Sequence, residues 1–153
     1  MTDNIVNSKW RGRISRYAPL VLWIGVIFVL STGQASMSET SRIIRPVLEF
    51  LFPSAPEETI LFYLVGIRKS AHVAEYAVLA FLASRAFRRS SIKILQRFWF
   101  VSALVLVILI ASIDEYGQSL RPERTGSIYD VLIDIFGGLA ALIGTWTLSA
   151  RRR

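Results

Sequence analysis

Long apolar segments alternate along this chain with shorter segments that carry most of its charge. Four apolar blocks lie at about 17–36, 71–87, 98–114 and 129–149. A helix needs about 20 mostly apolar residues to cross the hydrocarbon core of a bilayer, with about 17–25 the usual range. The pattern therefore predicts an all-α, polytopic membrane helical bundle with four transmembrane helices, in a single domain over residues 1–153. The second block is the most polar, and we interpret it as a span because the third block then enters the membrane in the correct direction.

The segment between the first two blocks predicts one or two short interfacial helices. Residues 41–52 place apolar side chains at helical spacing (Ile43, Ile44, Val47, Leu48 and Leu51), which is typical of an amphipathic helix lying at a membrane surface. We expect Pro46 in the first turn of this helix, where its missing N–H is tolerated. A second helix should begin near Glu57, and Gly66 should mark a bend before the second span.

Lys and Arg residues predict the orientation, because they accumulate on the cytoplasmic side of a membrane. Twelve of the 18 lie before the first block, from Arg85 at the end of the second to the start of the third, and after the fourth, together with one acid. The alternate loops and the block ends beside them hold the other six bases and ten of the 11 acids. We therefore expect a multi-pass protein of the cytoplasmic (inner) membrane with both termini cytoplasmic.

Composition narrows the possible chemistry. The net charge of +7 fits a membrane anchor on anionic lipid, and because the bases gather at span ends without interleaved aromatics, we expect no nucleic-acid partner. The chain has no cysteine, which excludes disulfides, thiolate metal sites and a cysteine nucleophile. The N-terminal region resembles a signal peptide, but we interpret its long apolar stretch as an uncleaved first span.

Polar side chains gather at the ends of the spans that the orientation places outside. Ionisable groups at membrane depth cost about 2.5–3.5 kcal/mol each on insertion scales, so their default interpretation is functional. Lys69, His72 and Tyr76 share one face of the second block, with Glu75 beside them. A lone histidine on an apolar helix is often a satisfied core residue, but its acidic and basic neighbours favour a site here.

The third and fourth blocks add further members of this group. Asp114, Glu115 and Gln118 close the third block at the negative end of its helix dipole, so a nearby cation such as Arg124 or Arg121, or a bound ion, should offset them. Ser127, Asp130 and Asp134 project from one face of the fourth, which continues with Gly137, Gly138 and Ala141, with Gly144 adjacent. Small residues let helices approach closely. We expect an outward-facing polar cup.

Three segments resemble the VanZ-like family of integral membrane proteins, which includes a teicoplanin-resistance determinant. They are KSAHVAEYAVL at 69–79, DEYGQSLRPERTGSIYDVLIDIFG at 114–137, and the Ser-rich LSTGQASMS at 30–38. The resemblance covers about residues 20–145. Two positions depart from the family pattern, because Val73 replaces a frequent aromatic residue and Asp134 a common Asn. The resemblance implies an envelope protein linked to glycopeptide resistance, and it brings no established reaction.

Several functions remain open. The cup could bind a lipid-linked cell-wall precursor, an anionic lipid or another amphiphile, with Lys69, Glu75, Tyr76, Gln118, Ser127 and Asp134 as binding residues. It could instead be a membrane-embedded hydrolase or transferase, with His72, Asp114, Glu115, Arg124 and Asp130 as catalytic candidates. The sequence requires no cofactor, although His72, Glu75, Asp114 and Asp130 have donor atoms suited to a divalent cation. An ion or proton relay, or a purely structural network, would also account for the polar groups.

Overall fold

The structure is a computed structural model that describes the backbone of residues 2–31, 37–120 and 127–151 and the side chains of residues 12–31, 41–120 and 127–151. Over these ranges the chain is all-α. Its helices are α1 (Thr2–Val29), α2 (Met37–Leu51), α3 (Glu57–Arg88), α4 (Lys93–Arg97), α5 (Trp99–Ser119) and α6 (Ile128–Ala150). The prediction of an all-helical protein is confirmed.

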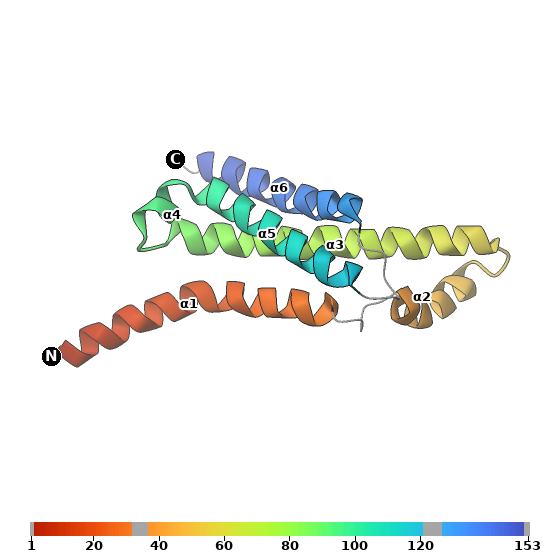
Figure 1. Ribbon diagram of the computed structural model, residues 1–153, viewed down its shortest axis with the longest axis horizontal. Helices are drawn as coiled ribbons and strands as arrows, with labels where there is room; N and C mark the ends of the chain where they lie inside the picture. Colours follow the sequence, from red (N-terminus) through yellow and green to blue (C-terminus); the bar gives the residue numbers. More distant parts are fainter. Residues whose placement is uncertain (1, 32–36, 121–126, 152–153) are drawn as a thin grey trace.

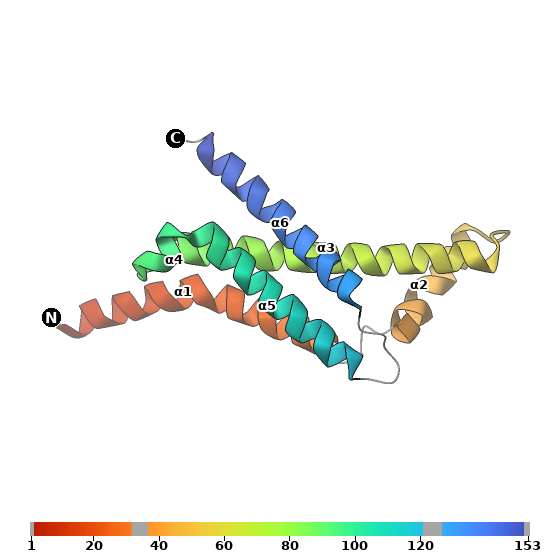
Figure 2. The same ribbon diagram turned by 45° about the horizontal axis from the view of Figure 1, so that its top comes forward.

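Four helices lie side by side, with α3 in contact with each of α1, α5 and α6. Helices α1 and α5 run in one direction and α3 and α6 in the other, so that α3 and α6 are parallel (Figures 1 and 2). Both termini and α4 lie at one end of the bundle, which we call the termini end. Helix α2, the C-terminus of α5 and the N-terminus of α6 lie toward the other, which we call the α2 end.

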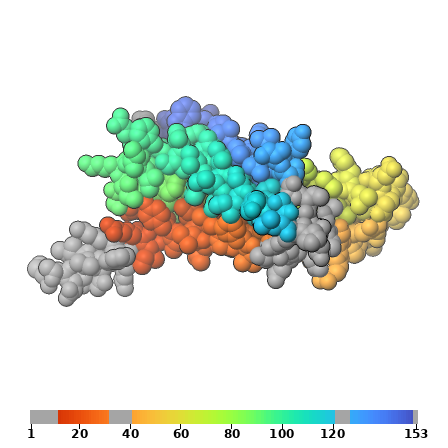
Figure 3. Space-filling model, viewed as in Figure 1, coloured from red at the N-terminus to blue at the C-terminus, as the bar shows by residue number. Residues whose placement is uncertain are grey.

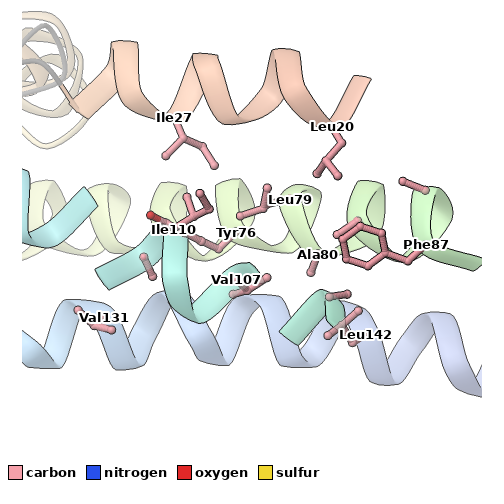
Figure 4. Close-up of a cluster of buried hydrophobic side chains, with 14 residues drawn as sticks. Leu20, Ile27, Tyr76, Leu79, Ala80, Phe87, Val107, Ile110, Val131 and Leu142 are labelled. Atoms are coloured by element: carbon pink, nitrogen blue, oxygen red, sulfur yellow. The ribbon is translucent and has the colours of Figure 1, made fainter. Parts of the chain in front are cut away.

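Alanines on α3 allow the neighbouring helices to pack closely at the core. Ala80, Ala83 and Ala86 are fully buried in one cluster with larger side chains from all four long helices. Figure 4 shows this cluster, with Leu20 and Ile27 of α1 facing α3. Because α3 contacts each of the other three long helices, it helps to position the polar ends of α5 and α6.

The prediction of four spans is wrong in its count. In the described part of the chain, three helices are long and apolar enough to cross a membrane, at Gly12–Val29, Trp99–Ser119 and Ile128–Ala150. The second predicted span belongs to α3, whose apolar character is reduced by His72, Glu75 and Arg85. The bounds of two predicted spans also differ. The candidate first span begins earlier, at Gly12, and ends earlier, at Val29, and the third extends past Asp114 to Ser119.

Helix α3 also corrects the predicted second interfacial helix. It continues without a break through Gly66, so the segment that begins at Glu57 and the second block form one helix of 32 residues. A glycine in a helix interior costs only about 0.5–1 kcal/mol relative to alanine, and packing overrides that cost. The N-terminal part of α3 extends past the other long helices, and α2 packs against it (Figure 1).

The amphipathic helix in this loop is confirmed, but it begins at Met37 and therefore places Pro46 in its interior rather than its first turn. Its apolar residues divide between two environments. Leu48 is buried against Ile60 and Leu64 of α3, while Ile43, Val47 and Phe50 stay exposed. Arg45 bonds to Glu49 and to Glu57, which joins α2 to the first turn of α3.

Large apolar side chains are exposed on the outside of the bundle. Phe81, Val101, Leu109 and Phe136 are each more than half exposed. Soluble proteins rarely expose contiguous apolar patches of more than a few hundred Å². Together with the three candidate spans, this surface indicates a membrane protein, which covers its exposed apolar residues with lipid. Figure 3 shows one face of the molecule, on which α1, α5 and α6 follow one another from bottom to top.

Candidate functional site at the α2 end

Two ion-pair contacts, about one helical turn apart, join polar side chains of α3 to carboxylates of α6. Lys69 Nζ lies 3.3 Å from Asp130 Oδ1, and His72 Nδ1 lies 3.4 Å from Asp134 Oδ1. The Lys69–Asp130 pair is half-exposed, whereas Asp134 is fully buried and His72 is about one-fifth exposed. The two pairs therefore follow one another from the surface of the site toward its interior.

The His72–Asp134 pair is close enough for an ion pair but is not aligned as a hydrogen bond. His72 Nδ1 and both carboxylate oxygens of Asp134 are buried and make no hydrogen bond among the described residues. A buried polar atom without a partner is costly. These atoms can consequently form hydrogen bonds to a ligand that enters the site.

Gly137 allows α3 and α6 to come together directly beside this pair. A Cβ atom at Gly137 would lie 2.4 Å from the carbonyl oxygen of Val73 and 2.9 Å from its Cα atom, both of which are backbone atoms of α3. At Gly138, a Cβ would lie 2.7 Å from Cγ1 of Val107 on α5. Close packing was predicted for Gly137, Gly138 and Gly144, and it holds for the first two, since Gly144 has no atom within 4 Å of such a Cβ.

Asp114 forms a second centre, in the last turns of α5. Its Oδ2 atom accepts hydrogen bonds from the Tyr76 hydroxyl at 3.2 Å and from Gln118 Nε2 at 3.1 Å. All three side chains are buried. Two neutral donors thus contact Asp114, and the predicted offset by a cation stays a prediction, because Arg121 and Arg124 lie outside the described residues.

Glu115 fastens the start of α6. Its Oε1 atom accepts a hydrogen bond from the backbone N–H of Ser127 at 2.8 Å. Ser127 in turn caps α6 by accepting from the Tyr129 N–H, as expected for a serine at this position. Glu115 is buried within the protein. Its contact indicates a role in positioning α6.

Glu75 is the least constrained member of the group. Its backbone carbonyl accepts a hydrogen bond from Trp23 Nε1 of α1 at 3.0 Å, which ties α1 to α3 at the level of the site. Its Oε1 atom is buried without a hydrogen-bond partner in the described chain. The sequence did not reveal the Trp23 contact, because an apolar span gives no signal for which of its aromatic side chains faces a neighbour.

Two pockets flank His72. The smaller, of about 130 Å³, lies between α3 and α6 and is lined by Lys69, Asp130, Asp134 and their neighbours. The larger, of about 260 Å³, lies between α1, α2, α3 and α5. Arg68 and His72 line both pockets, so these two side chains form the boundary between them. Arg68 was not among the predicted site residues, although it lies four residues before His72 on α3.

The larger pocket has a mixed lining. Its polar residues are Arg68, His72, Glu75, Asp114 and Gln118, and its apolar residues include Ile27, Leu30, Ile44, Ile67 and Ala71.

The structure gathers the predicted residues at one end but in separate pairs. His72 contacts Asp134, which was predicted as a binding residue, and not one of the acids predicted as catalytic candidates. Within the ranges that the structure describes, no three His, Asp or Glu side chains converge as ligands for one metal ion. The role of Arg124 stays a prediction, because this residue lies outside those ranges.

Comparison with protein families shows what this chain is similar to. A family model described as VanZ/LLP1 matches residues 17–149, nearly the whole chain. No curated protein and no solved structure gives a significant match.

Proposed function

Because the chain belongs to the VanZ/LLP1 family and has apolar helices suited to a bilayer, we propose that its α2 end binds a lipid-linked or amphiphilic component of the cell envelope. Binding would hold the polar headgroup at His72 and Arg68 and part of the adjoining chain against α1 and α2. A change in susceptibility to lipid-anchored glycopeptides is the cellular effect we expect from such binding.

The amphipathic larger pocket is the observation that carries this proposal. A site for a small polar ligand needs no apolar wall, and a site for a hydrocarbon chain needs no charged groups. This pocket is lined both by Ile27, Ile44 and Ala71 and by Glu75 and Asp114. Ligand pockets commonly combine an apolar lining with a few placed polar groups. An amphiphile matches both kinds of lining at once.

Arg68 is the residue we expect to select the headgroup. It lines both pockets, and an arginine presents paired donors to a phosphate or carboxylate. Lys69 is less suited to this role because Asp130 already neutralises it. Tyr76 and Gln118, which were predicted as binding residues, both donate hydrogen bonds to Asp114 and therefore position its carboxylate.

The orientation is part of the proposal. Both termini lie at the same end of the bundle (Figure 1). That end carries the five bases from Arg85 to Arg97, while the acids of α3, α5 and α6 lie toward the other end. Positive charge favours the cytoplasmic side. We therefore expect the termini end to be cytoplasmic and the α2 end to face the outside of the inner membrane.

Single cysteines test this orientation directly, because the natural chain has none. Ser54 and Ser91 are both exposed, in the loop after α2 and the loop after α3. We expect an impermeant maleimide, applied to cells with a permeabilised outer layer and an intact inner membrane, to label the Ser54→Cys variant. The Ser91→Cys variant should react only after the inner membrane is disrupted. The reverse pattern would contradict the proposed orientation.

The binding proposal predicts that filling the larger pocket abolishes binding. Ala71→Trp puts a large side chain into that pocket, and we expect at least about a tenfold loss of affinity, or 1.4 kcal/mol. Arg68→Gln should also weaken binding, because it removes the paired donors. The measurement is titration of the purified protein in nanodiscs with a fluorescent lipid-linked cell-wall precursor.

Ala74→Trp is the matched control, since Ala74 is exposed on the same helix and lines neither pocket. It should bind like the natural protein. Equal losses in the Ala71 and Ala74 variants would mean that tryptophan perturbs α3 generally. If the natural protein shows no saturable binding, the proposal is wrong.

A hydrolase or transferase is the second candidate, favoured by His72 lying 3.4 Å from a buried carboxylate beside a pocket. A carboxylate next to a histidine can orient the ring and stabilise its charged form during proton transfer. Mass spectrometry of the lipid after the same incubation distinguishes the candidates. A product that forms with the natural protein and not with His72→Ala would establish the reaction.

A further inference from the structure

Two adjoining pockets lie at the termini end, opposite the site described above. They measure about 490 and 500 Å³, and Arg88 lines both. The first also includes Trp99 and Trp146, and the second includes Arg85 and Arg89. They lie between the C-terminal turns of α3, the start of α5 and the end of α6. Figure 2 shows the end of α6 diverging from α3 here.

The charge in these pockets is uniformly positive. Neither pocket has an acidic residue in its lining, and the sequence contains no acid between Glu75 and Asp114 or after Asp134. In the part of the chain that the structure describes, no carboxylate pairs with Arg85, Arg88 or Arg89. The C-terminal dipole of α3 offsets part of this charge, but such an effect is equivalent to about half an elementary charge.

Tryptophan rings give one pocket an apolar side. Trp99 and Trp146 come from different helices and line the pocket together with Arg88. The Arg88 guanidinium lies 5.2 Å from the centre of the Trp99 ring, a cation–π contact that holds this charge at the pocket. Tryptophan is enriched at membrane interfaces, where a lipid headgroup meets its acyl chains.

We propose that these pockets bind the phosphate of an anionic lipid. Arg88 would contact the phosphate together with Arg85 or Arg89, since arginines bind phosphate oxygens through paired hydrogen bonds. Trp99 and Trp146 would pack beside the glycerol and the first carbons of the chains. Basic pockets between membrane helices are known to bind such headgroups. This site is separate from the one at the α2 end and does not depend on the function proposed there.

Native mass spectrometry of the delipidated protein in detergent tests the proposal. The probes are phosphatidylglycerol and phosphatidylcholine with the same acyl chains, because both carry a phosphate and only the first has a net charge. We expect phosphatidylglycerol to bind preferentially, and Arg88→Gln to reduce its binding by about tenfold. Arg85→Gln should also reduce the binding of phosphatidylglycerol.

Arg97→Gln and Lys93→Gln are the matched controls, since both residues are basic, exposed and near this end but line neither pocket. They should bind phosphatidylglycerol like the natural protein. Equal losses in the Arg88 and Arg97 variants would show only a general charge effect and would overturn the proposal, as would equal binding of the two lipids.

Inorganic phosphate tests whether the pockets recognise a lipid or only a phosphate group, because free phosphate offers the same oxygens without acyl chains. If the lipid binds and millimolar inorganic phosphate does not displace it, the pocket recognises a lipid headgroup, as proposed. If inorganic phosphate binds to the natural protein as tightly as the lipid does, the tryptophan side contributes nothing and the lipid assignment is wrong.

Discussion

Gly137→Ala is expected to destabilise the folded protein by about 1–3 kcal/mol, the usual cost of an overpacked core. The added methyl group would lie 2.4 Å from the carbonyl oxygen of Val73, which belongs to the backbone of α3 and cannot rotate away. The helices would have to separate where His72 meets Asp134. The measurement is equilibrium unfolding in mixed micelles of dodecyl maltoside and SDS, followed by tryptophan fluorescence.

Gly144→Ala is the control on the same helix. No atom lies within 4 Å of its added Cβ, so this variant should be as stable as the natural protein, or more stable by up to about 1 kcal/mol because alanine favours the helix. Gly138→Ala should be intermediate, because the Val107 side chain that it meets can move slightly. Equal stabilities of the Gly137 and Gly144 variants would show that α3 and α6 do not approach so closely.

Asp114→Leu should have a comparably large effect through hydrogen bonding. It leaves the buried Tyr76 hydroxyl and the buried Gln118 amide without their shared acceptor. A buried donor without a partner costs about 1–3 kcal/mol, so we expect a loss of about 2–6 kcal/mol for the two. The same unfolding experiment measures it, together with the yield of monodisperse protein.

Two further variants separate the lost hydrogen bonds from a change of shape. Asp114→Asn keeps an acceptor oxygen and should be much more stable than Asp114→Leu. Adding Tyr76→Phe to Asp114→Leu removes one of the unpaired donors and should recover part of the lost stability, a coupling that a double-mutant cycle isolates. If Tyr76→Phe adds its full cost to the leucine variant, the hydroxyl does not depend on Asp114.

The position of Gly137 links the stability of the bundle to its site. Helices α3 and α6 approach closely at Val73, one residue from His72, and the Lys69–Asp130 and His72–Asp134 pairs both cross the same interface. A loss of packing there should separate both pairs. The glycine therefore contributes to the geometry of the smaller pocket as well as to packing.

The sequence by itself determined the helical class, the amphipathic helix after the first span and the end at which polar groups gather. Each of these depends on local properties. Apolar length gives membrane helices, helical spacing puts Lys69, His72 and Tyr76 on one face, and a serine before Asp130 marks the start of α6. It also carried the motifs of the family to which the chain belongs.

Only the tertiary structure decided which polar groups meet. Spacing on one helix cannot show that His72 contacts Asp134 while Asp114 receives Tyr76 and Gln118, because these partners depend on the relative rotation of α3, α5 and α6. The sequence also did not show that two predicted segments form the single helix α3. Gly66 weakens a helix locally, and only packing decides that the helix continues through it. Composition likewise treats Gly137 and Gly144 as equivalent, and only the path of the neighbouring backbone distinguishes them.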